Sequence, residues 1–252
     1  MPTVQLSIAV SSKETGALLK QYLVDRGVNL GYSTTHGICY GGVIYHTEHR
    51  LNQRCYTDKI TRMNAMRAHG VQTVPWFSKD DTCGINGLTI INRLTYPLLA
   101  RKSYGFGGTD IVPVFQAEEL PWRIAAGWDW FSQYIPVRTE YRVWVFQGEC
   151  IGTYEKVMQR PADYKYIGRN FRNGFEFQRV GNTIELTRLC YTALEAIGLD
   201  FAAVDVLIGM DNQTYILEVN TAPGVLASHA EPTLAILADR MVRWVASTPT
   251  RL

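Results

Sequence analysis

The sequence predicts an α+β fold in which antiparallel strand pairs are flanked by helices. Two apolar stretches with alternating side chains each contain a short turn, at Gln147-Gly148 and at Asp211-Asn212. Stretches of this kind are typical of β-hairpins. Helical spacing of apolar residues appears between them, at residues 183–197. Strands that are joined by short turns favour an α+β fold over a doubly wound parallel sheet.

The composition fits a soluble globular protein. The chain has 252 residues, of which 46% are hydrophobic and 19% are charged, and its net charge is only +2. This balance gives no strong attraction to nucleic acid or to membrane surfaces. No apolar run approaches the roughly 20 residues of a transmembrane helix, and no signal-peptide pattern is visible. The five cysteines are scattered without a CxxC pair, so we expect reduced thiols in a cytoplasmic protein. The oligomeric state is left open.

The first elements form a small unit and then a helix. Residues 4–10 alternate like a strand, a helical pattern follows, and "GICYGGVIYH" has the pattern of a strand and turn. These elements predict an N-terminal α/β cap at residues 1–56. A further helix is predicted within residues 57–70, with Thr57 as its N-cap and Gly70 as its stop.

Strands dominate the rest of the chain. "YPLLARKS" and "IVPVF" are predicted strands on either side of "YGFGGTD", and "WFSQYI" and the two hairpins follow. The helix at residues 183–197 is closed by Gly198, and a final helix is predicted from about Glu231 to Val245.

The second hairpin carries a cluster of oxygen-bearing side chains. Glu218 and Asn220 are two residues apart at the end of a strand, so they point to the same face. An antiparallel partner strand can bring Asp205 onto that face as well. Charged residues on a hairpin are usually solvated, but the neighbouring "FAAV" and "YIL" are strongly apolar. Two carboxylates and an amide are ligands that Mg²⁺ takes beside water and phosphate, so metal binding is favoured.

A glycine-rich loop lies between two predicted strands. Gly105, Gly107 and Gly108 allow the backbone to approach a ligand closely and to offer N–H groups to phosphates. Arg101 and Lys102 precede the loop, and strand alternation lets only one of them face the ligand. The loop is not a Walker motif, because no GK[ST] follows it.

Two further groups of charged residues admit a structural and a functional interpretation. Glu140 and Arg142 share one face of a strand and could form a simple ion pair, or Arg142 could bind a phosphate or carboxylate bidentately. A loop-like region is locally basic, and it is equally a solvated face or a site for an anionic substrate. Its cations are Arg160, Lys165, Arg169, Arg172 and Arg179.

Together these motifs resemble the ATP-grasp superfamily, and within it the carboxylate–amine ligases similar to the ribosomal-protein glutamate ligases. "DKITRMNAMRAHGVQTVP", "YPLLARKSYGFGGTDI", "FSQYI", "EYRVWV" and "GLDFAAVDVL…YILEVNTAPG" appear in the family order over about residues 51–226. The resemblance implies an ATP-grasp fold, with two α+β subdomains that grip ATP behind the short cap. The expected division is 1–56 for the cap, 57–132 for the small lid subdomain and 133–252 for the large subdomain with the metal hairpin.

The resemblance implies a nucleotide site around the lid. Lys59 and Arg101 would contact the ATP phosphates together with the loop glycines Gly105, Gly107 and Gly108. The family usually has lysine where Arg101 stands, and Lys102 is an alternative contact. The hinge would bind the adenine edge through its backbone, and Gln133 replaces the acid that is common there. The hinge residues are Ser132, Gln133 and Tyr134.

The resemblance also assigns residues to the large subdomain. Glu140 would bind the ribose hydroxyls, and Arg142 the transferring phosphate or the acyl phosphate. Mg²⁺, with Mn²⁺ as an alternative, would be held by Asp205, Glu218 and Asn220. Lys156, Arg169 and Asn170 lie on the expected substrate side, where Lys156 would act in catalysis and the other two would bind the substrate carboxylate.

The activity implied is ATP-dependent amide or peptide bond formation through an acyl phosphate, with release of ADP and phosphate. The expected partners are a small-molecule or peptide carboxylate and an amine. Relatives with a thiol or another acceptor are one alternative. A non-catalytic ATP-binding module is another, favoured only by Arg101 and Gln133. A nucleic-acid binder fits poorly with a net charge of +2.

Overall fold

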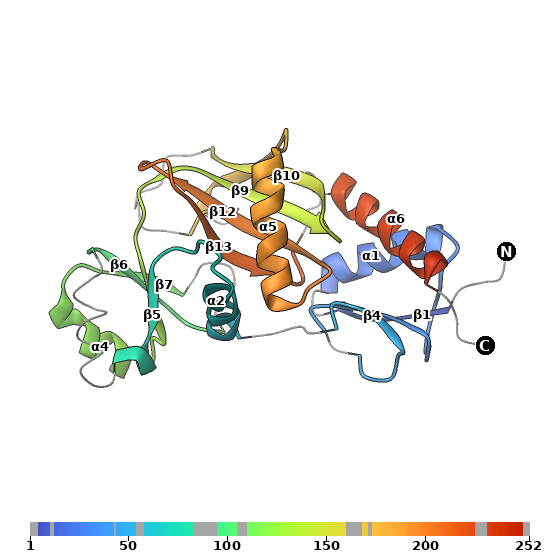
Figure 1. Ribbon diagram of the computed structural model, residues 1–252, viewed down its shortest axis with the longest axis horizontal. Coiled ribbons are helices and arrows are strands. Elements are labelled where there is room, and N and C mark those ends of the chain that lie inside the picture. Colours follow the sequence, from blue (N-terminus) through green and yellow to red (C-terminus); the bar gives the residue numbers. More distant parts are fainter. Residues whose placement is uncertain are drawn as a thin grey trace.

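Three β-sheets follow one another along the molecule, as Figure 1 shows. The structure is a computed structural model, and it describes residues 5–10, 13–42, 44–53, 58–82, 95–104, 110–159, 168–170, 173–224 and 231–248. The small sheet with β5, β6 and β7 lies at one end, the long strands of the central sheet lie in the middle, and the N-terminal sheet lies at the other end.

The N-terminal sheet is parallel, with the strand order β2-β1-β3-β4. Its elements are β1 (Gln5–Val10), α1 (Lys13–Asp25), β2 (Asn29–Leu30), β3 (His36–Tyr40) and β4 (His49–Leu51). The buried side chains of Leu6, Leu19, Leu23 and Ile38 join β1 and β3 to α1. The predicted α/β character of the cap is therefore confirmed.

The central sheet is antiparallel and has the order β11-β10-β9-β12-β13. Its strands are β9 (Val137–Phe146), β10 (Glu149–Met158), β11 (Phe175–Val180), β12 (Phe201–Gly209) and β13 (Thr214–Asn220). Both predicted hairpin turns are confirmed. Gln147 and Asn212 have φ of 45° and 61°, and Gly148 has φ of 84°, values that such turns require.

Side-chain alternation divides the central sheet into two different faces. One face carries Val143, Val145, Val204 and Val206 against α5 (Ile184–Ile197). The other face carries Trp144, Phe146, Phe201 and Tyr154, which pack with the N-terminal unit and with α6 (Glu231–Ser247). Helix α6 lies beside α1, so the end of the described chain returns to its beginning (Figure 1).

Two helices have well-defined caps. Helix α5 has Thr183 as its N-cap, whose side chain accepts the N–H of Leu186, and it ends at the predicted stop Gly198 with φ of 67°. Helix α2 (Lys59–Ala68) is capped by Asp58, which accepts from the N–H groups of Ile60 and Thr61. The prediction of Thr57 as the N-cap was therefore wrong by one residue. Thr57 itself lies outside the described residues.

The small sheet is antiparallel and has the order β5-β8-β6-β7. Its strands are β5 (Trp76–Ser78), β6 (Leu98–Arg101), β7 (Ile111–Val114) and β8 (Trp130–Gln133), with the short helices η1 (Lys79–Thr82), η2 (Ala117–Glu119) and α4 (Leu120–Ala125) beside them. Phe77, Leu98, Val114 and Phe131 form its core. Gly105, Gly107 and Gly108 lie outside the described residues.

The basic region is not entirely a loop, which corrects the sequence interpretation. Phe175–Val180 forms β11, which pairs with β10 at the edge of the central sheet. The alternation in "FEFQRV" is a strand signal that the many cations of this region obscured. Arg160, Lys165 and Arg172 lie outside the described residues.

The three sheets follow the three predicted segments, except that β8 extends one residue past 132 to Gln133, and the division into domains itself stays a prediction. Helix α2 belongs to the segment 57–132 but packs against α5 of the following segment, as Figure 1 shows. Among the described residues, no helix combines the length and the apolar character that a membrane span requires.

Asn52 joins the N-terminal unit to the start of β12. Its Oδ1 accepts the N–H groups of Asp200 and Phe201 at 2.8 and 3.0 Å, and its Nδ2 donates to the Phe201 carbonyl at 2.9 Å. Asn52 is fully buried and has φ of 58°, a conformation that asparagine tolerates better than most residues. One side chain of the N-terminal unit thus makes three hydrogen bonds to the backbone at the start of β12.

Asn52→Ala should lower the free energy of unfolding by about 3 kcal/mol, because it leaves buried backbone groups without partners and places alanine at a positive φ. Urea unfolding measures this value. Asn64→Ala, an exposed change in α2, is the control and should alter the value by less than about 0.7 kcal/mol. Equal effects of the two substitutions would contradict the role of Asn52.

Candidate active site

A row of charged side chains crosses the central sheet on the face that also packs against the N-terminal unit. Arg142 on β9 lies directly opposite Asp205 on β12, and Asp205 lies directly opposite Glu218 on β13. Asn220 follows two residues after Glu218. The predicted arrangement of the second hairpin is confirmed in this respect, because the register brings Asp205 and Glu218 together.

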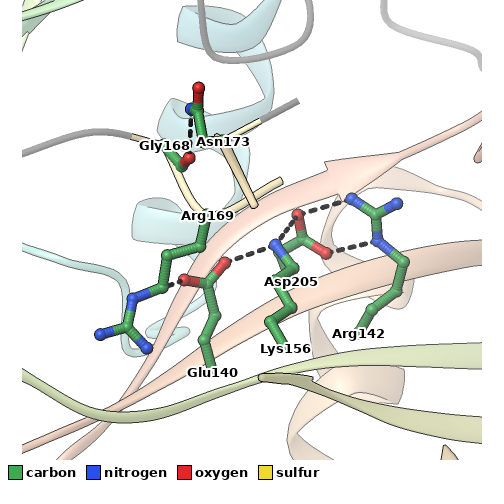
Figure 2. Close-up of polar contacts among 7 residues, drawn as sticks. All are labelled: Glu140, Arg142, Lys156, Gly168, Arg169, Asn173 and Asp205. Carbon is green, nitrogen blue, oxygen red and sulfur yellow. Dashed lines mark hydrogen bonds and ion pairs between the residues drawn. The ribbon is translucent and has the colours of Figure 1, made fainter. Parts of the chain in front are cut away.

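Asp205 is held by two cations from neighbouring strands (Figure 2). Arg142 donates from Nε to Oδ1 at 2.7 Å and from Nη2 to Oδ2 at 2.9 Å. Lys156 on β10 donates from Nζ to the same Oδ2 at 3.0 Å. Bidentate arginine–carboxylate pairs are among the strong charge-assisted hydrogen bonds, so Asp205 is fixed in position.

The charge row continues past Lys156. Its ammonium also donates to Oε1 of Glu140, and Oε2 of Glu140 lies 3.9 Å from Nε of Arg169. Figure 2 shows the resulting alternation of cations and carboxylates. The side chains of Lys156 and Glu140 are only 4% and 6% exposed. The simple Glu140–Arg142 pair that strand alternation allowed is not formed, because each residue finds its partner on another strand.

Burial and pairing set the pKa values of this row. Burial disfavours the charged form of Asp205, but Arg142 and Lys156 outweigh it and hold the pKa of Asp205 well below its ordinary value. Burial also opposes the charge of Arg142, but the attraction and hydrogen bonds of Asp205 raise the pKa of Arg142 above its ordinary value. Asp205 and Arg142 are therefore both charged at neutral pH.

A pocket lies beside the charge row, between α2, the small sheet and β13. It is partly open to solvent. Its charged lining includes Lys59, Arg62, Arg101 and Glu218, and its apolar lining is Met63, Met66, Trp130, Leu217 and Val219. Nζ of Lys59 lies 3.3 Å from Oε1 of Glu218. The pocket thus brings together Lys59, Arg101 and Glu218, three of the predicted site residues.

Arg101 and Lys102 have different surroundings, as strand alternation requires. Arg101 lines the pocket, donates to Oγ of Ser132 at 3.2 Å and lies over the ring of Trp130. Burial lowers the pKa of Arg101 more than the attraction of Glu218 and Glu140 raises it, although an arginine stays protonated at neutral pH. Lys102 is exposed and lies over Trp128. Only Arg101 is brought into the pocket.

The hinge residues are largely engaged within the small sheet. Ser132 is fully buried and pairs with Trp76 and Leu99. The N–H groups of Gln133 and Tyr134 donate to the carbonyls of Pro75 and Pro97, at 2.8 and 3.0 Å. These two N–H groups therefore already have partners. The predicted adenine contact of the hinge stays a prediction.

The donor set of the hairpin fits a hard divalent cation. Asp205 and Glu218 supply carboxylates at adjacent positions, and Nδ2 of Asn220 is buried without a hydrogen-bond partner among the described residues. A buried donor of this kind would be satisfied by an acceptor, whereas the amide oxygen Oδ1 is the atom of Asn220 that could ligate a cation. No group of three or more His, Cys, Asp or Glu in the described part of the chain is arranged for a metal. The candidate third donor at this hairpin is an amide instead.

The predicted substrate residues are adjacent in sequence, and Arg169 is the one that contacts the charge row. Arg169 is near Glu140 and above the ring of Phe175. Asn170 accepts the N–H of Asn173 at its Oδ1, 3.0 Å away, and so shapes a turn. Two aromatic residues of β11, Phe175 and Phe177, were missed by the sequence interpretation. Their spacing of two residues is the signal that could have placed them on one strand face.

The comparisons with known proteins agree with this geometry. The family model of the RimK-like ATP-grasp domain matches residues 89–245. A D-alanine–D-alanine ligase of Clostridium beijerinckii is 21% identical over 200 residues, which cover 73% of this chain and 64% of that ligase. The chain therefore spans less than two thirds of the length of this curated relative.

Solved structures share the fold at low sequence identity. The ATP-grasp ligase PsnB complexed with minimal precursor has a TM-score of 0.70 at 12% identity, and the match covers 96% of this chain and 99% of PsnB. The D-alanine–D-alanine ligase from Bacillus anthracis has a TM-score of 0.67 at 14% identity, with 97% and 99% covered. The predicted ATP-grasp fold is confirmed.

Lys156→Met should lower the free energy of unfolding by about 3 kcal/mol, because it leaves Glu140 buried without its closest cation. The double variant Lys156→Met/Glu140→Gln removes both charges and should recover at least about 1 kcal/mol of this loss. Urea unfolding of both variants measures the difference.

Glu149→Gln is the surface control for this experiment. It breaks the pair with Arg240, in which the Glu149 side chain is 59% exposed, and it should cost less than about 1 kcal/mol. A double variant that is less stable than Lys156→Met would contradict the coupling.

Proposed function

The chain belongs to the RimK-like ATP-grasp family, and from this we propose that it is an ATP-dependent carboxylate–amine ligase. The observation that carries the proposal is the charge row, in which Arg142, Asp205 and Glu218 stand side by side on three strands. This row adjoins a pocket whose cations suit an anionic ligand. Phosphoryl transfer needs such an arrangement, since its catalysis consists mainly of positioning and charge neutralisation.

The metal would be Mg²⁺, with Mn²⁺ as an alternative, because both prefer oxygen ligands. Asp205, Glu218 and Asn220 would hold it. When bound, the metal would neutralise phosphate charge and orient the phosphates for transfer. Asp205 is already fixed by two hydrogen bonds from Arg142.

The nucleotide phosphates would lie at the pocket, where Lys59 and Arg101 provide positive charge. The cation of Arg101 is only partly compensated by nearby carboxylates, since burial dominates its pKa. An anionic ligand would complete its environment. The glycines 105, 107 and 108 would cover the phosphates, and the backbone of Ser132, Gln133 and Tyr134 would read the base. Glu140 would bind the ribose, and Lys102 contributes no pocket contact in this arrangement.

The reaction would have two steps. A carboxylate oxygen of the substrate forms a bond to the γ-phosphorus of ATP while the bond to the β-phosphate oxygen breaks and ADP leaves. The amine nitrogen then attacks the acyl carbon, the bond from this carbon to the phosphate oxygen breaks, and phosphate and a proton are released. Exclusion of water protects the acyl phosphate from hydrolysis.

Arg142 and Lys156 would serve these steps with charges that are already in place. The bonds of Arg142 to Asp205 use Nε and Nη2 and leave Nη1 outside the pair, so Nη1 would contact the transferring phosphate or the oxyanion. Donors that are fixed before the reaction stabilise developing charge without reorganisation. Lys156 would assist Arg142, and Arg169 with Asn170 would bind the substrate carboxylate.

The carboxylate substrate would be a small molecule or a peptide, and the acceptor an amine. A peptide is supported by the likeness to PsnB, which has also been solved in complex with a precursor peptide. A small molecule is supported by the likeness to D-alanine–D-alanine ligases. A thiol acceptor and a non-catalytic ATP-binding role are the alternatives. The full charge row argues against the non-catalytic role, because binding alone would not need it.

A screen of amino acids and peptides with Mg²⁺ and ATP tests the proposal. ADP and phosphate should appear only when a carboxylate and an amine are both present. Glu218→Ala should abolish this release and keep the near-ultraviolet circular dichroism of the wild type, since it removes one of three metal donors. Release that requires a thiol favours the thiol alternative, and ATP binding without any release favours the non-catalytic one. Normal turnover by Glu218→Ala contradicts the metal assignment.

Arg142→Lys should lower kcat about 100-fold and change the KM for ATP much less. Lysine keeps the charge but cannot keep the bidentate pair with Asp205, and the lost contact is one that strengthens in the transition state. Steady-state kinetics with the substrates from the screen measure both constants. A loss of ATP affinity as large as the loss in kcat would contradict the role of Arg142.

A further inference from the structure

The edge strand β11 presents two aromatic side chains to the charge row. Phe177 lies directly opposite Lys156 in the pairing of β11 with β10, and Phe175 lies opposite Met158. Residues two apart on a strand share a face, so both rings lie on the face of the sheet that carries the charges. Neither ring has a role in the site as described so far.

The ring of Phe177 contacts two cations at once. Cζ of Arg142 lies 4.9 Å from the ring centroid, and Nζ of Lys156 lies 5.8 Å from it. Both cations also donate to Asp205. The positive charges of Arg142 and Lys156 repel each other. The carboxylate of Asp205 and the negative face of the Phe177 ring both offset this repulsion.

Phe175 makes a similar cation–π contact with a different cation. Its ring centroid lies 5.3 Å from Cζ of Arg169, and its side chain is buried. Each ring of β11 therefore contacts a different set of cations. Phe177 contacts Arg142 and Lys156, which are proposed to act on the reacting groups. Phe175 contacts Arg169, which is proposed to bind the substrate.

We propose that Phe177 is a positioning residue of the active site, which holds the charged groups of Arg142 and Lys156 beside Asp205. This inference rests on the proposed function of the same site. Phe177 also packs against the core around α6, which a leucine of similar size would still do. A leucine has no aromatic face for the cations, so the two contributions can be separated by substitution.

Phe177→Leu should lower kcat roughly 10-fold with Mg²⁺, ATP and the acid and amine from the screen, while the KM for ATP changes less than about 2-fold. Phe177→Tyr keeps the aromatic face and should restore most of kcat. Phe175→Leu is the matched control on the same strand. It should raise the KM for the acid instead, because it acts on Arg169. Unchanged kcat in Phe177→Leu, or no recovery in Phe177→Tyr, overturns the proposal.

A second measurement needs no substrate. Hydrogen exchange of the Arg142 Nε–H, followed by side-chain NMR, should be faster in Phe177→Leu than in the wild type, in Phe177→Tyr and in Phe175→Leu. Equal exchange in all four proteins overturns the proposal. A wild type that never releases ADP in the screen contradicts the proposed function, and the exchange comparison then decides the role of Phe177 separately.

Discussion

Charged side chains inside a protein must neutralise one another, and this constraint organises the molecule. Removing an ion from water costs several kcal/mol even after relaxation. Lys156, Glu140 and Asp205 are nearly fully buried, and they satisfy the constraint only because β9, β10 and β12 bring opposite charges into contact. A shift in strand register would leave a buried charge without a partner. The charge pairs therefore favour this register, and the register in turn places the charges of the site.

The face of the central sheet that carries the charges is apolar at one end of its strands and charged further from the N-terminal unit. Near the N-terminal unit it carries Trp144, Phe146 and Phe201, which are covered by that unit and by α6. Two residues before Trp144 in β9, the same face carries Arg142. The Tyr40 hydroxyl donates to the Pro223 carbonyl at 2.6 Å, and Asn52 fixes the start of β12. Both hydrogen bonds lie at the same end of the β12–β13 hairpin, where the start of β12 pairs with the end of β13. The N-terminal unit therefore fixes that end of the strands that hold the charges.

Local patterns predicted more of this structure than long-range partners did. The Asp205–Glu218 pairing follows from two-residue alternation and a turn at Asp211-Asn212, both visible in a short stretch. The Lys156–Glu140 pair could not be predicted, because an irregularity between Cys150 and Gly152 shifts the register of β9 and β10 by one residue from the one that the turn at Gln147-Gly148 implies. Strand β11 was missed because the cations of the surrounding basic region obscured the alternation of Phe175 and Phe177. Strand alternation predicted that Arg101 and Lys102 point to opposite faces. Which of the two faces the ligand could be decided only from the position of the pocket.

A crystal structure with Mg²⁺ and a non-hydrolysable ATP analogue tests the central claim most directly. The account predicts a metal ligated by oxygen atoms of Asp205, Glu218 and Asn220, and a triphosphate next to Lys59 and Arg101. A nucleotide bound away from the pocket, or a metal held by other residues, would contradict it.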